Sequence, residues 1–295
     1  MAKLKLSIII TAWKEPKTIG KAIESFVKQD IKVPYELIAA CPDEETREVI
    51  RKYQKKYKQI KYFKDPGKGK PIALNMIFKE VKGEILILSD GDVFVNDGCV
   101  NLFLKRFEDK KVGAVCGHPI PTNSRNNKFG YWAHLLTSAV HKQRLNHEKG
   151  VMACSGYLYS IRAGVVKEIP KDTLSDDALI SYMIYNKKYK VIYEPEAIVN
   201  VKYPTIFKDW ISQKRRSAGG YNQIKYIFKQ EVDRSVSKES KGIFFVLRFP
   251  RSLKEIFWTI GLVFARIYLW YRIFKDINKN TWKFEDIWTR IESTK

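Results

Sequence analysis

The sequence predicts an α/β fold, in which a mostly parallel sheet is flanked by helices and followed by further C-terminal helices. Short apolar runs, such as those at 6–10 and 35–41, are typical of buried strands. Segments with helical spacing separate these runs, which is the pattern of βαβ units in a parallel sheet. From Pro204 onward the spacing is helical to the end, and Trp and Tyr are scattered through basic sequence.

The first half alternates strands and helices in a regular order. Strands are expected at 6–10, 35–41, 60–63 and 84–89, with helices at 19–27, 44–57 and 71–81. The second half predicts strands at 112–118, 152–162 and 190–199, and helices at 126–147 and 175–186. Ligands of parallel sheets bind beyond the carboxyl ends of the strands, where Asp43, Asp65 and Asp90 fall.

Composition indicates a globular protein in a reducing compartment. The 295 residues are 45% hydrophobic and 29% charged, which excludes intrinsic disorder and a collagen-like repeat. Four cysteines stand far apart without a C-x-x-C pair, so we expect buried reduced thiols and no zinc site. The start of the chain lacks the apolar stretch and cleavage site of a signal peptide, which predicts a cytosolic protein.

The charge of the chain is unusually positive. Lys and Arg number 54 against 32 Asp and Glu, a formal net charge of +22. Such an excess predicts a polyanionic neighbour: nucleic acid, nucleotide phosphates or an anionic membrane. The last 94 residues carry 20 basic and 9 acidic side chains, and the first 201 carry 34 and 23. Charge density therefore roughly doubles in the C-terminal third.

Asp90-Gly91-Asp92 is the sharpest local signal. Two carboxylates two positions apart, at the end of a buried strand, can approach one Mg²⁺ or Mn²⁺ ion and link it to a diphosphate. An ordinary acidic turn is the alternative interpretation. Lys68 and Lys70 stand beside glycines ahead of a predicted helix, where they either contact phosphate or lie on a solvated surface.

Asp176 and Asp177 form a second acidic pair, at the start of a predicted helix. A carboxylate there could take the proton of an acceptor hydroxyl as a general base. Helix capping is the alternative, because the helix dipole favours acidic residues in the first turn.

Six motifs, taken in order, resemble those of the family 2 glycosyltransferases over about residues 5–222. The matching segments are Ser7 to Glu15, Asp43, Gly67 to Asn75, Cys154 to Arg162, Ser175 to Leu179 and Gln213 to Ser217. The last segment departs from the family, because Ser217 stands at the position of a tryptophan that processive polysaccharide synthases use at the acceptor end. That departure predicts against processive chain extension.

The resemblance implies a GT-A fold, which is Rossmann-like, and inverting transfer from a UDP-sugar. It places the donor at Thr11, Ala12, Glu15, Asp43, Asp65, Lys68, Lys70 and Asp90, and a Mn²⁺ or Mg²⁺ ion on Asp90 and Asp92. Asp177 matches the family's base, Asp176 supports it, and Gln213 and Arg216 complete the catalytic set. Cations at these positions would stabilise the negative charge that builds on the leaving diphosphate.

Residues 256–271 form an apolar, aromatic segment with basic flanks. The segment is too short and too charged for a confident membrane span, which needs roughly 20 apolar residues. It fits a helix lying in a membrane interface, and packing on the catalytic domain is the alternative. We therefore expect a catalytic domain over 1–222 and a basic, membrane-interfacial helical region over 223–295.

Together these observations predict an inverting, metal-dependent glycosyltransferase. It would act on the cytoplasmic membrane face, as a peripheral or monotopic protein, on a polyisoprenyl phosphate or a lipid-linked saccharide. The expected partners are the UDP-sugar, the lipid-linked acceptor and the anionic membrane surface, with no nucleic acid and no obligate protein partner. The alternatives are a soluble or polysaccharide acceptor, a nucleotidyltransferase that releases pyrophosphate, or a non-catalytic protein that binds nucleic acid.

Overall fold

The computed structural model describes residues 5–147, 150–229, 243–278 and 291–294. The chain divides into two compact units. The first comprises Met1–Pro119, Val151–Lys171 and Asp176–Val201, and the second comprises Ile120–Gly150, Asp172–Ser175 and Lys202–Lys295. The functional boundary expected at residue 222 stays a prediction.

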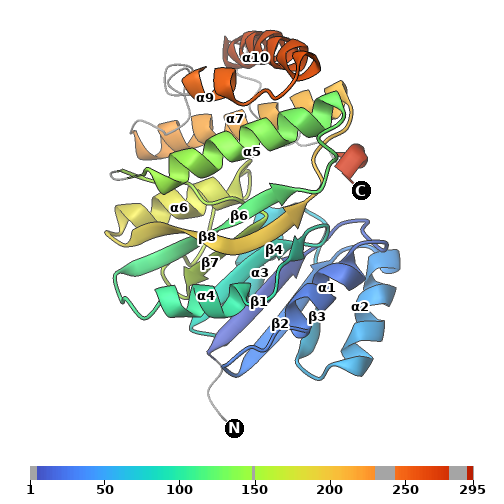
Figure 1. Ribbon diagram of the computed structural model, residues 1–295. Coiled ribbons are helices and arrows are strands. Elements are labelled where there is room, and N and C mark those ends of the chain that lie inside the picture. The colour runs from blue at the N-terminus through green and yellow to red at the C-terminus, as the bar shows by residue number, and fades with distance from the viewer. Residues whose placement is uncertain (1–4, 148–149, 230–242, 279–290, 295) are drawn as a thin grey trace. The chain divides into compact units, whose positions relative to one another are not determined.

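The first unit is built on an eight-stranded sheet with the order β3-β2-β1-β4-β7-β6-β8-β5 (Figure 1). Its four leading strands run parallel: β1 (Leu6–Thr11), β2 (Tyr35–Cys41), β3 (Ile60–Lys64) and β4 (Ile85–Asp90). All four lie where the apolar runs predict them, and Ile8, Ile9 and Ile10 of β1 are fully buried. Because these strands share one direction, their carboxyl ends meet at one edge of the sheet.

The other half of the sheet is antiparallel, so the whole sheet is mixed. β7 (Leu158–Arg162) pairs antiparallel with β4 and with β6 (Val112–Pro121), and β5 (Phe94–Val95) pairs antiparallel with β8 (Lys190–Val201). The expected strand at 152–162 begins only at Leu158. Side chains explain the late start, because the backbone N–H groups of Cys154, Ser155 and Gly156 donate to side-chain atoms and not to a neighbouring strand.

Five helices are described in the first unit. They are α1 (Ile19–Val27), α2 (Glu44–Lys56), α3 (Lys70–Glu80), α4 (Cys99–Arg106) and α6 (Asp176–Asn186). α1 buries Ile19, Ala22, Ile23 and Phe26, which recur at the spacing of one helix face. The four cysteines are buried thiols, as predicted.

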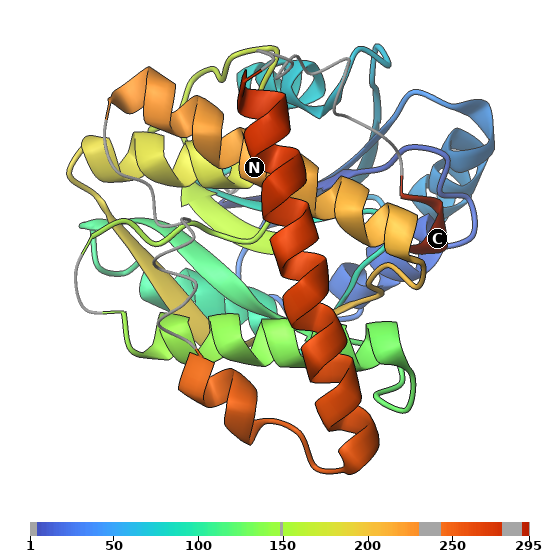
Figure 2. The same cartoon turned by 90° about the horizontal axis from the view of Figure 1, so that it is seen from above.

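The second unit is helical. It contains α5 (Lys128–Leu145), α7 (Phe207–Phe228), α9 (Ile243–Arg248), α10 (Leu253–Asn278) and the short 3₁₀ helix η1 (Glu292–Thr294). Figure 2 shows α10 running across α5 and α7. One face of α10 joins their shared core through Leu262, Ala265, Leu269 and Ile273. This 3–4 spacing makes α10 amphipathic, with one buried side.

Ion pairs fasten both ends of α10 to the rest of its unit. Near the start, Arg125 donates to both carboxylate oxygens of Glu255, at 2.7 and 2.9 Å. Near the end, Arg215 donates twice to Oδ2 of Asp276, at 2.8 and 2.6 Å. The Arg125 hydrogen bonds hold the pKa of Glu255 down to about 2. Glu255 and Asp276 are the two acidic residues of α10, so both of its negative charges are buried and paired.

Candidate active site

The candidate site lies at the carboxyl edge of the four parallel strands in the first unit. Thr11 is in register with Asp90 across β1 and β4. The Gly91 N–H donates to the Thr11 carbonyl at 2.9 Å, and the Ala12 N–H donates to the Ala40 carbonyl at 2.9 Å. Three residues that the sequence assigned to the donor, Thr11, Ala12 and Asp90, are thus held together by the sheet.

Asp43 anchors the loop that follows β1. It is the N-cap of α2, accepting from the Thr46 N–H at 3.0 Å through Oδ1, and it also accepts from the Lys14 N–H at 2.7 Å through Oδ2. Lys14 has a φ of 55°, so this bond stabilises a backbone conformation that non-glycine residues rarely adopt. Burial raises the pKa of Asp43, but the hydrogen bonds from Thr46 and Lys14 outweigh it and lower the pKa overall. Its predicted place in the donor site stays a prediction.

Glu15, in the loop that follows β1, packs against Gly91. Glu15 is 8% exposed, and its N–H donates to Thr46 Oγ1 at 2.9 Å. A Cβ on Gly91 would lie 2.5 Å from Glu15 Oε2 and 2.6 Å from Ala12 Cβ. Glycine is therefore required between the two aspartates because this loop approaches so closely.

We expect Gly91→Ala to destabilise the chain by about 1–3 kcal/mol, the usual cost of overpacking. The added methyl group must displace Ala12 or Glu15. Thermal unfolding measures the loss, with Gly261→Ala as the matched control, since a Cβ there would lie at an ordinary 3.6 Å from the nearest atom, Trp132 Cζ2. Equal unfolding temperatures for Gly91→Ala and the native chain would contradict this account.

The loop after β3 leads into α3. Asp65 Oδ1 accepts from the Gly67 N–H at 2.8 Å, and burial raises the pKa of Asp65. Gly67 and Gly69 have φ values of 71° and 103°, which a side chain would oppose. Lys68 between them is exposed. The structure thus places Asp65 and Lys68 between a strand and a helix that the sequence predicted.

Lys70, the first residue of α3, connects the two acidic motifs. Its Nζ lies 2.7 Å from Asp90 Oδ1 and 3.5 Å from Asp176 Oδ2. Burial lowers the pKa of Lys70, but the charges of Asp176 and Asp90 outweigh it, so the pKa is raised. Lys70 is therefore a fixed cation between the D-x-D sequence and the acidic pair at the start of α6.

Asp177 contacts the loop that precedes β7, which is part of the segment Cys154 to Arg162 that resembles the family. Its Oδ2 accepts from the Gly156 N–H at 2.6 Å. Burial, and next the charge of Asp176, raise the pKa of Asp177 to about 6. A Cβ on Gly156 would lie 3.2 Å from Asp177 Oδ2, and the Tyr159 hydroxyl donates to Asp176 Oδ2 at 3.4 Å. Gly156 and Tyr159 are supporting residues that sequence reasoning did not name individually.

Gln213 and Arg216 lie on α7, in the second unit. They are three positions apart, so their side chains share one face of the helix. Their catalytic roles stay predictions.

The donor set of Asp90 and Asp92 fits a divalent cation. Both are carboxylates at the end of β4, and hard cations such as Mg²⁺ and Mn²⁺ prefer oxygen ligands. Among the described residues, no group of three or more His, Cys, Asp or Glu side chains is arranged to hold a metal. Two carboxylates suit an ion that takes further ligands from substrate phosphates and water.

Comparisons with known proteins identify related sequences. The family described as "Glycosyltransferase like family 2" matches residues 4–220. The probable glycosyltransferase YdaM of Bacillus subtilis is 26% identical over 75% of this chain and 56% of its own length. The poly-β-1,6-N-acetyl-D-glucosamine synthase of Staphylococcus epidermidis is 21% identical over 86% of this chain and 62% of its own length. The chain thus spans about three fifths of these relatives.

Solved structures show the same fold. The mannosyltransferase PcManGT from Pyrobaculum calidifontis, in complex with GDP-Man and Mn²⁺, has a TM-score of 0.59 at 16% identity, over 94% of this chain and 82% of that one. S. aureus TarS 1–349 in complex with UDP-GlcNAc has a TM-score of 0.54 at 16% identity, over 88% and 79%. These likenesses confirm the predicted GT-A fold, and the match over residues 4–220 shows that the chain belongs to glycosyltransferase family 2.

Proposed function

We propose that this chain transfers a sugar, with inversion, from a UDP-sugar to a lipid-linked acceptor at the cytoplasmic face of a membrane. The observation that carries the proposal is the cluster of Lys70, Asp90, Asp176 and Asp177 at the carboxyl edge of the parallel strands. It combines a fixed cation, a carboxylate suited to a metal and a carboxylate with a pKa of about 6. Inverting transfer needs a base and no covalent nucleophile, and Asp177 has the pKa of such a base.

On the donor side, the chain's own residues would orient a diphosphate and balance its charge. Lys70 is positive and already oriented by Asp90, so it would not need to reorganise as charge develops. Asp90 and Asp92 would hold Mn²⁺ or Mg²⁺, which supplies positive charge to the leaving diphosphate. TarS was solved with UDP-GlcNAc, which supports UDP as the carrier, whereas PcManGT was solved with GDP-Man.

The acceptor side of the proposal rests on α10. Among the described residues, α10 is the helix long and apolar enough to cross a membrane. Its outward side chains are large and apolar: Phe257 is 72% exposed, Phe264 66% and Ile267 61%. With Glu255 and Asp276 buried, the exposed charges of α10 are basic. An apolar face with basic neighbours is the chemistry of a helix lying on an anionic membrane.

The ion pairs at the two ends of α10 support a monotopic arrangement. The bidentate pair of Arg125 with Glu255 and the pair of Arg215 with Asp276 hold its two ends against one helical unit. A helix that crossed the bilayer would lose this packing and leave charges unpaired in hydrocarbon, which is costly.

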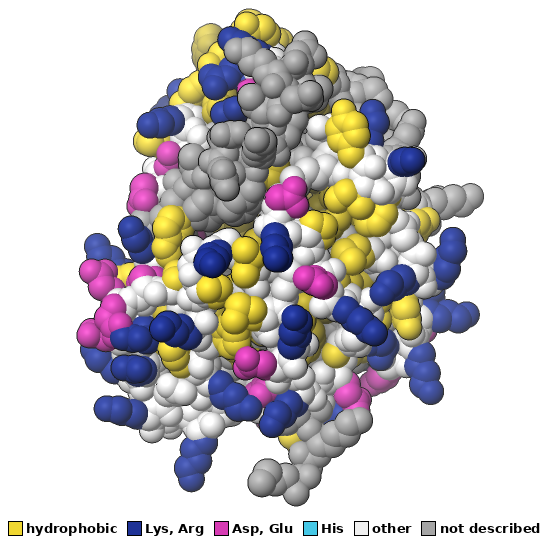
Figure 3. All heavy atoms as spheres, turned by 180° about the vertical axis from the view of Figure 1, so that it is seen from behind, with side chains coloured by type: hydrophobic (Ala, Val, Ile, Leu, Met, Phe, Trp, Pro, Cys, Tyr) yellow, Lys and Arg dark blue, Asp and Glu magenta, His cyan; other side chains and the backbone are white. Residues whose placement is uncertain are grey.

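On the face shown in Figure 3, Lys and Arg side chains are interspersed with acidic and apolar ones, which does not favour nucleic acid as the partner.

A donor screen tests the proposed reaction. The full chain is mixed with UDP-sugars and GDP-sugars, with Mn²⁺ or Mg²⁺, in the presence of lipid-linked acceptors. We expect metal-dependent release of UDP that rises with the acceptor. Release of GDP alone would refute the UDP donor, and release of pyrophosphate would indicate a nucleotidyltransferase.

We expect the double variant Phe257→Glu with Ile267→Glu to bind anionic liposomes at least about tenfold more weakly than the native chain. Each buried Phe or Ile contributes about 1.5–3 kcal/mol, and the new charges are repelled by the headgroups. Liposome sedimentation measures the loss. The matched control is Tyr185→Glu, on α6 of the first unit, where the side chain is 38% exposed. Equal binding by the native chain and the double variant would contradict the placement of α10 on the membrane surface.

A further inference from the structure

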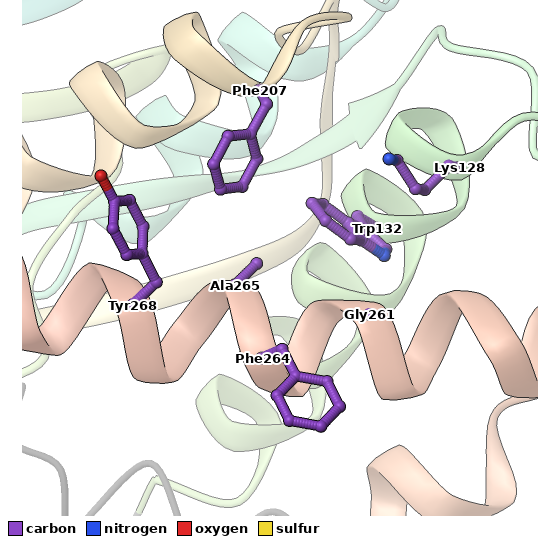
Figure 4. A pocket seen from close by; sticks show the side chains of 7 residues that line it. All are labelled: Lys128, Trp132, Phe207, Gly261, Phe264, Ala265 and Tyr268. Atoms are coloured by element: carbon purple, nitrogen blue, oxygen red, sulfur yellow. The ribbon is translucent and has the colours of Figure 1, made fainter.

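A pocket of about 400 Å³ lies among α5, α7 and α10 of the second unit. Figure 4 shows Trp132 from α5, Phe207 from α7 and Tyr268 from α10 around it. Gly261 and Ala265, one turn apart on α10, also line it and leave space where larger side chains would fill it. Its volume is at the small end of the range of roughly 300–1,000 Å³ that is typical of ligand sites.

The lining of the pocket is almost wholly apolar. Among its seven lining residues, the polar side-chain groups are the Lys128 ammonium, the Tyr268 hydroxyl and the Trp132 indole N–H. The indole N–H is already used, because it donates to the Trp258 carbonyl at 2.7 Å. A saccharide needs several hydrogen-bonding partners, and this lining offers few. A hydrocarbon chain ending in one anionic group matches it better.

Lys128 is placed to meet such an anion. Its side chain is exposed, and its Nζ lies 5.5 Å from the Trp132 ring centre and 4.9 Å from the Phe129 ring centre. Cation–π contacts of this kind hold an ammonium group over an apolar wall without neutralising it. The positive charge therefore stays available to a phosphate beside the pocket.

The pocket is continuous with the exposed apolar face of α10. Phe264 lines the pocket and is 66% exposed, and Ile260 and Ile267 beside it on the helix are 48% and 61% exposed. The two acids of α10 are paired with Arg125 and Arg215, so neither repels an anionic lipid. The surroundings of the pocket are thus apolar and basic.

We propose that this pocket binds one acyl chain of an anionic phospholipid of the membrane, with the lipid phosphate at Lys128. The inference rests on the proposed attachment of α10 to a membrane, and it adds a discrete lipid site to that surface. A single chain held in a pocket would fix the depth and rotation of α10 in the interface.

The test uses the full chain and myristoyl lysophosphatidylglycerol below its critical micelle concentration, with binding followed by calorimetry. We expect saturable binding of one lipid per chain. Gly261→Leu should weaken it at least tenfold by filling the pocket, whereas Val263→Leu, on α10 outside the pocket, should not change it. Lys128→Gln should weaken binding several-fold for this lipid and not for monomyristoylglycerol, which lacks the phosphate, and Lys254→Gln should have no effect.

Thermal unfolding shows whether Gly261→Leu folds, and Gly261→Ala supplies a smaller filling side chain that should give an intermediate loss. Unchanged lipid binding in folded Gly261→Leu overturns the proposal. It is also overturned if oligosaccharides of N-acetylglucosamine bind in place of the lipid, or if a short polyisoprenyl phosphate binds far more tightly. UDP-sugar binding is measured on the same samples. A chain that binds the lipid but no UDP-sugar would contradict the proposed reaction and still support the lipid site.

Discussion

We expect Asp177→Asn to slow transfer to a hydroxyl acceptor by about 10²–10⁴, the usual contribution of a general base. Asparagine has nearly the same shape, and its side-chain oxygen can still accept from the Gly156 N–H, now 2.6 Å from Asp177 Oδ2. It cannot take a proton. The fold and the UDP-sugar affinity should therefore stay nearly unchanged while the rate falls, which single-turnover kinetics and calorimetric titration of the donor will separate.

The pH dependence provides a second readout of the same residue. The pKa of Asp177 is raised to about 6, so the carboxylate becomes protonated as the pH falls through that value. A protonated carboxyl group is not a base, and kcat/KM of the native chain should fall on the acid side of about pH 6. Asp177→Asn should lose this acidic limb. An unshifted carboxyl group would give a limb near its ordinary pKa, two units lower.

The matched control is Asp97→Asn, which removes one negative charge from an exposed turn of the same unit. Its Oδ1 accepts from the neighbouring Gly98 N–H, a bond that asparagine keeps. Collapse of donor binding in Asp177→Asn, with an unaltered rate per bound donor, would make Asp177 a donor-side residue.

The same variant separates the two classes of lipid acceptor. A phosphate acceptor is already ionised and needs no base, whereas a sugar hydroxyl must lose a proton. A base with a pKa of about 6 would be of little use toward a phosphate. The raised pKa therefore favours a lipid-linked saccharide, and full activity of Asp177→Asn toward a polyisoprenyl phosphate would reverse that choice.

The sequence predicts the parallel strands well, and it finds β6 and β8 but neither their antiparallel pairing nor the short strand β5. β1 is a continuous apolar run, and β2 to β4 are short, largely apolar segments, so their strand type follows from local pattern alone. β7 lies between β4 and β6, and that pairing depends on contacts between segments far apart in the chain. Residues 152–157 look like a strand because they are apolar, yet their N–H groups bond to side chains such as Ser181 and Asp177.

The site shows the same division between local and distant signals. The sequence found Asp90, Asp176 and Asp177 from their positions at the ends of elements. It left phosphate contact and a solvated surface open for Lys70 beside the adjacent glycines, but the ion pair of Lys70 with Asp176 joins residues on α3 and α6 that no local pattern connects. Asp43 has a structural role that the sequence analysis did not foresee, since it caps α2 and also anchors Lys14 of the loop predicted to bind the donor.

We expect Asp92→Asn to reduce metal-dependent transfer by about 10²–10³, the range measured when one charge-stabilising group is removed from an active site. A neutral amide is a weaker ligand for a hard cation than a carboxylate. The affinity for Mn²⁺ in the presence of UDP should fall along with the rate. Electron paramagnetic resonance of free Mn²⁺ measures that affinity without any turnover.

Asp92 is a cleaner test of the metal than Asp90. Asp90 Oδ1 also accepts from Lys70 at 2.7 Å, so Asp90→Asn would loosen Lys70 and alter the charge balance at Asp176 as well. Asp97→Asn again serves as the control for loss of one charge. Undiminished turnover and Mn²⁺ affinity in Asp92→Asn would show that Asp92 is not a metal ligand and would remove it from the proposed site. Turnover of the native chain in the presence of a chelator would instead contradict the metal itself, and the charge of the leaving diphosphate would then have to be balanced by lysine and arginine side chains alone.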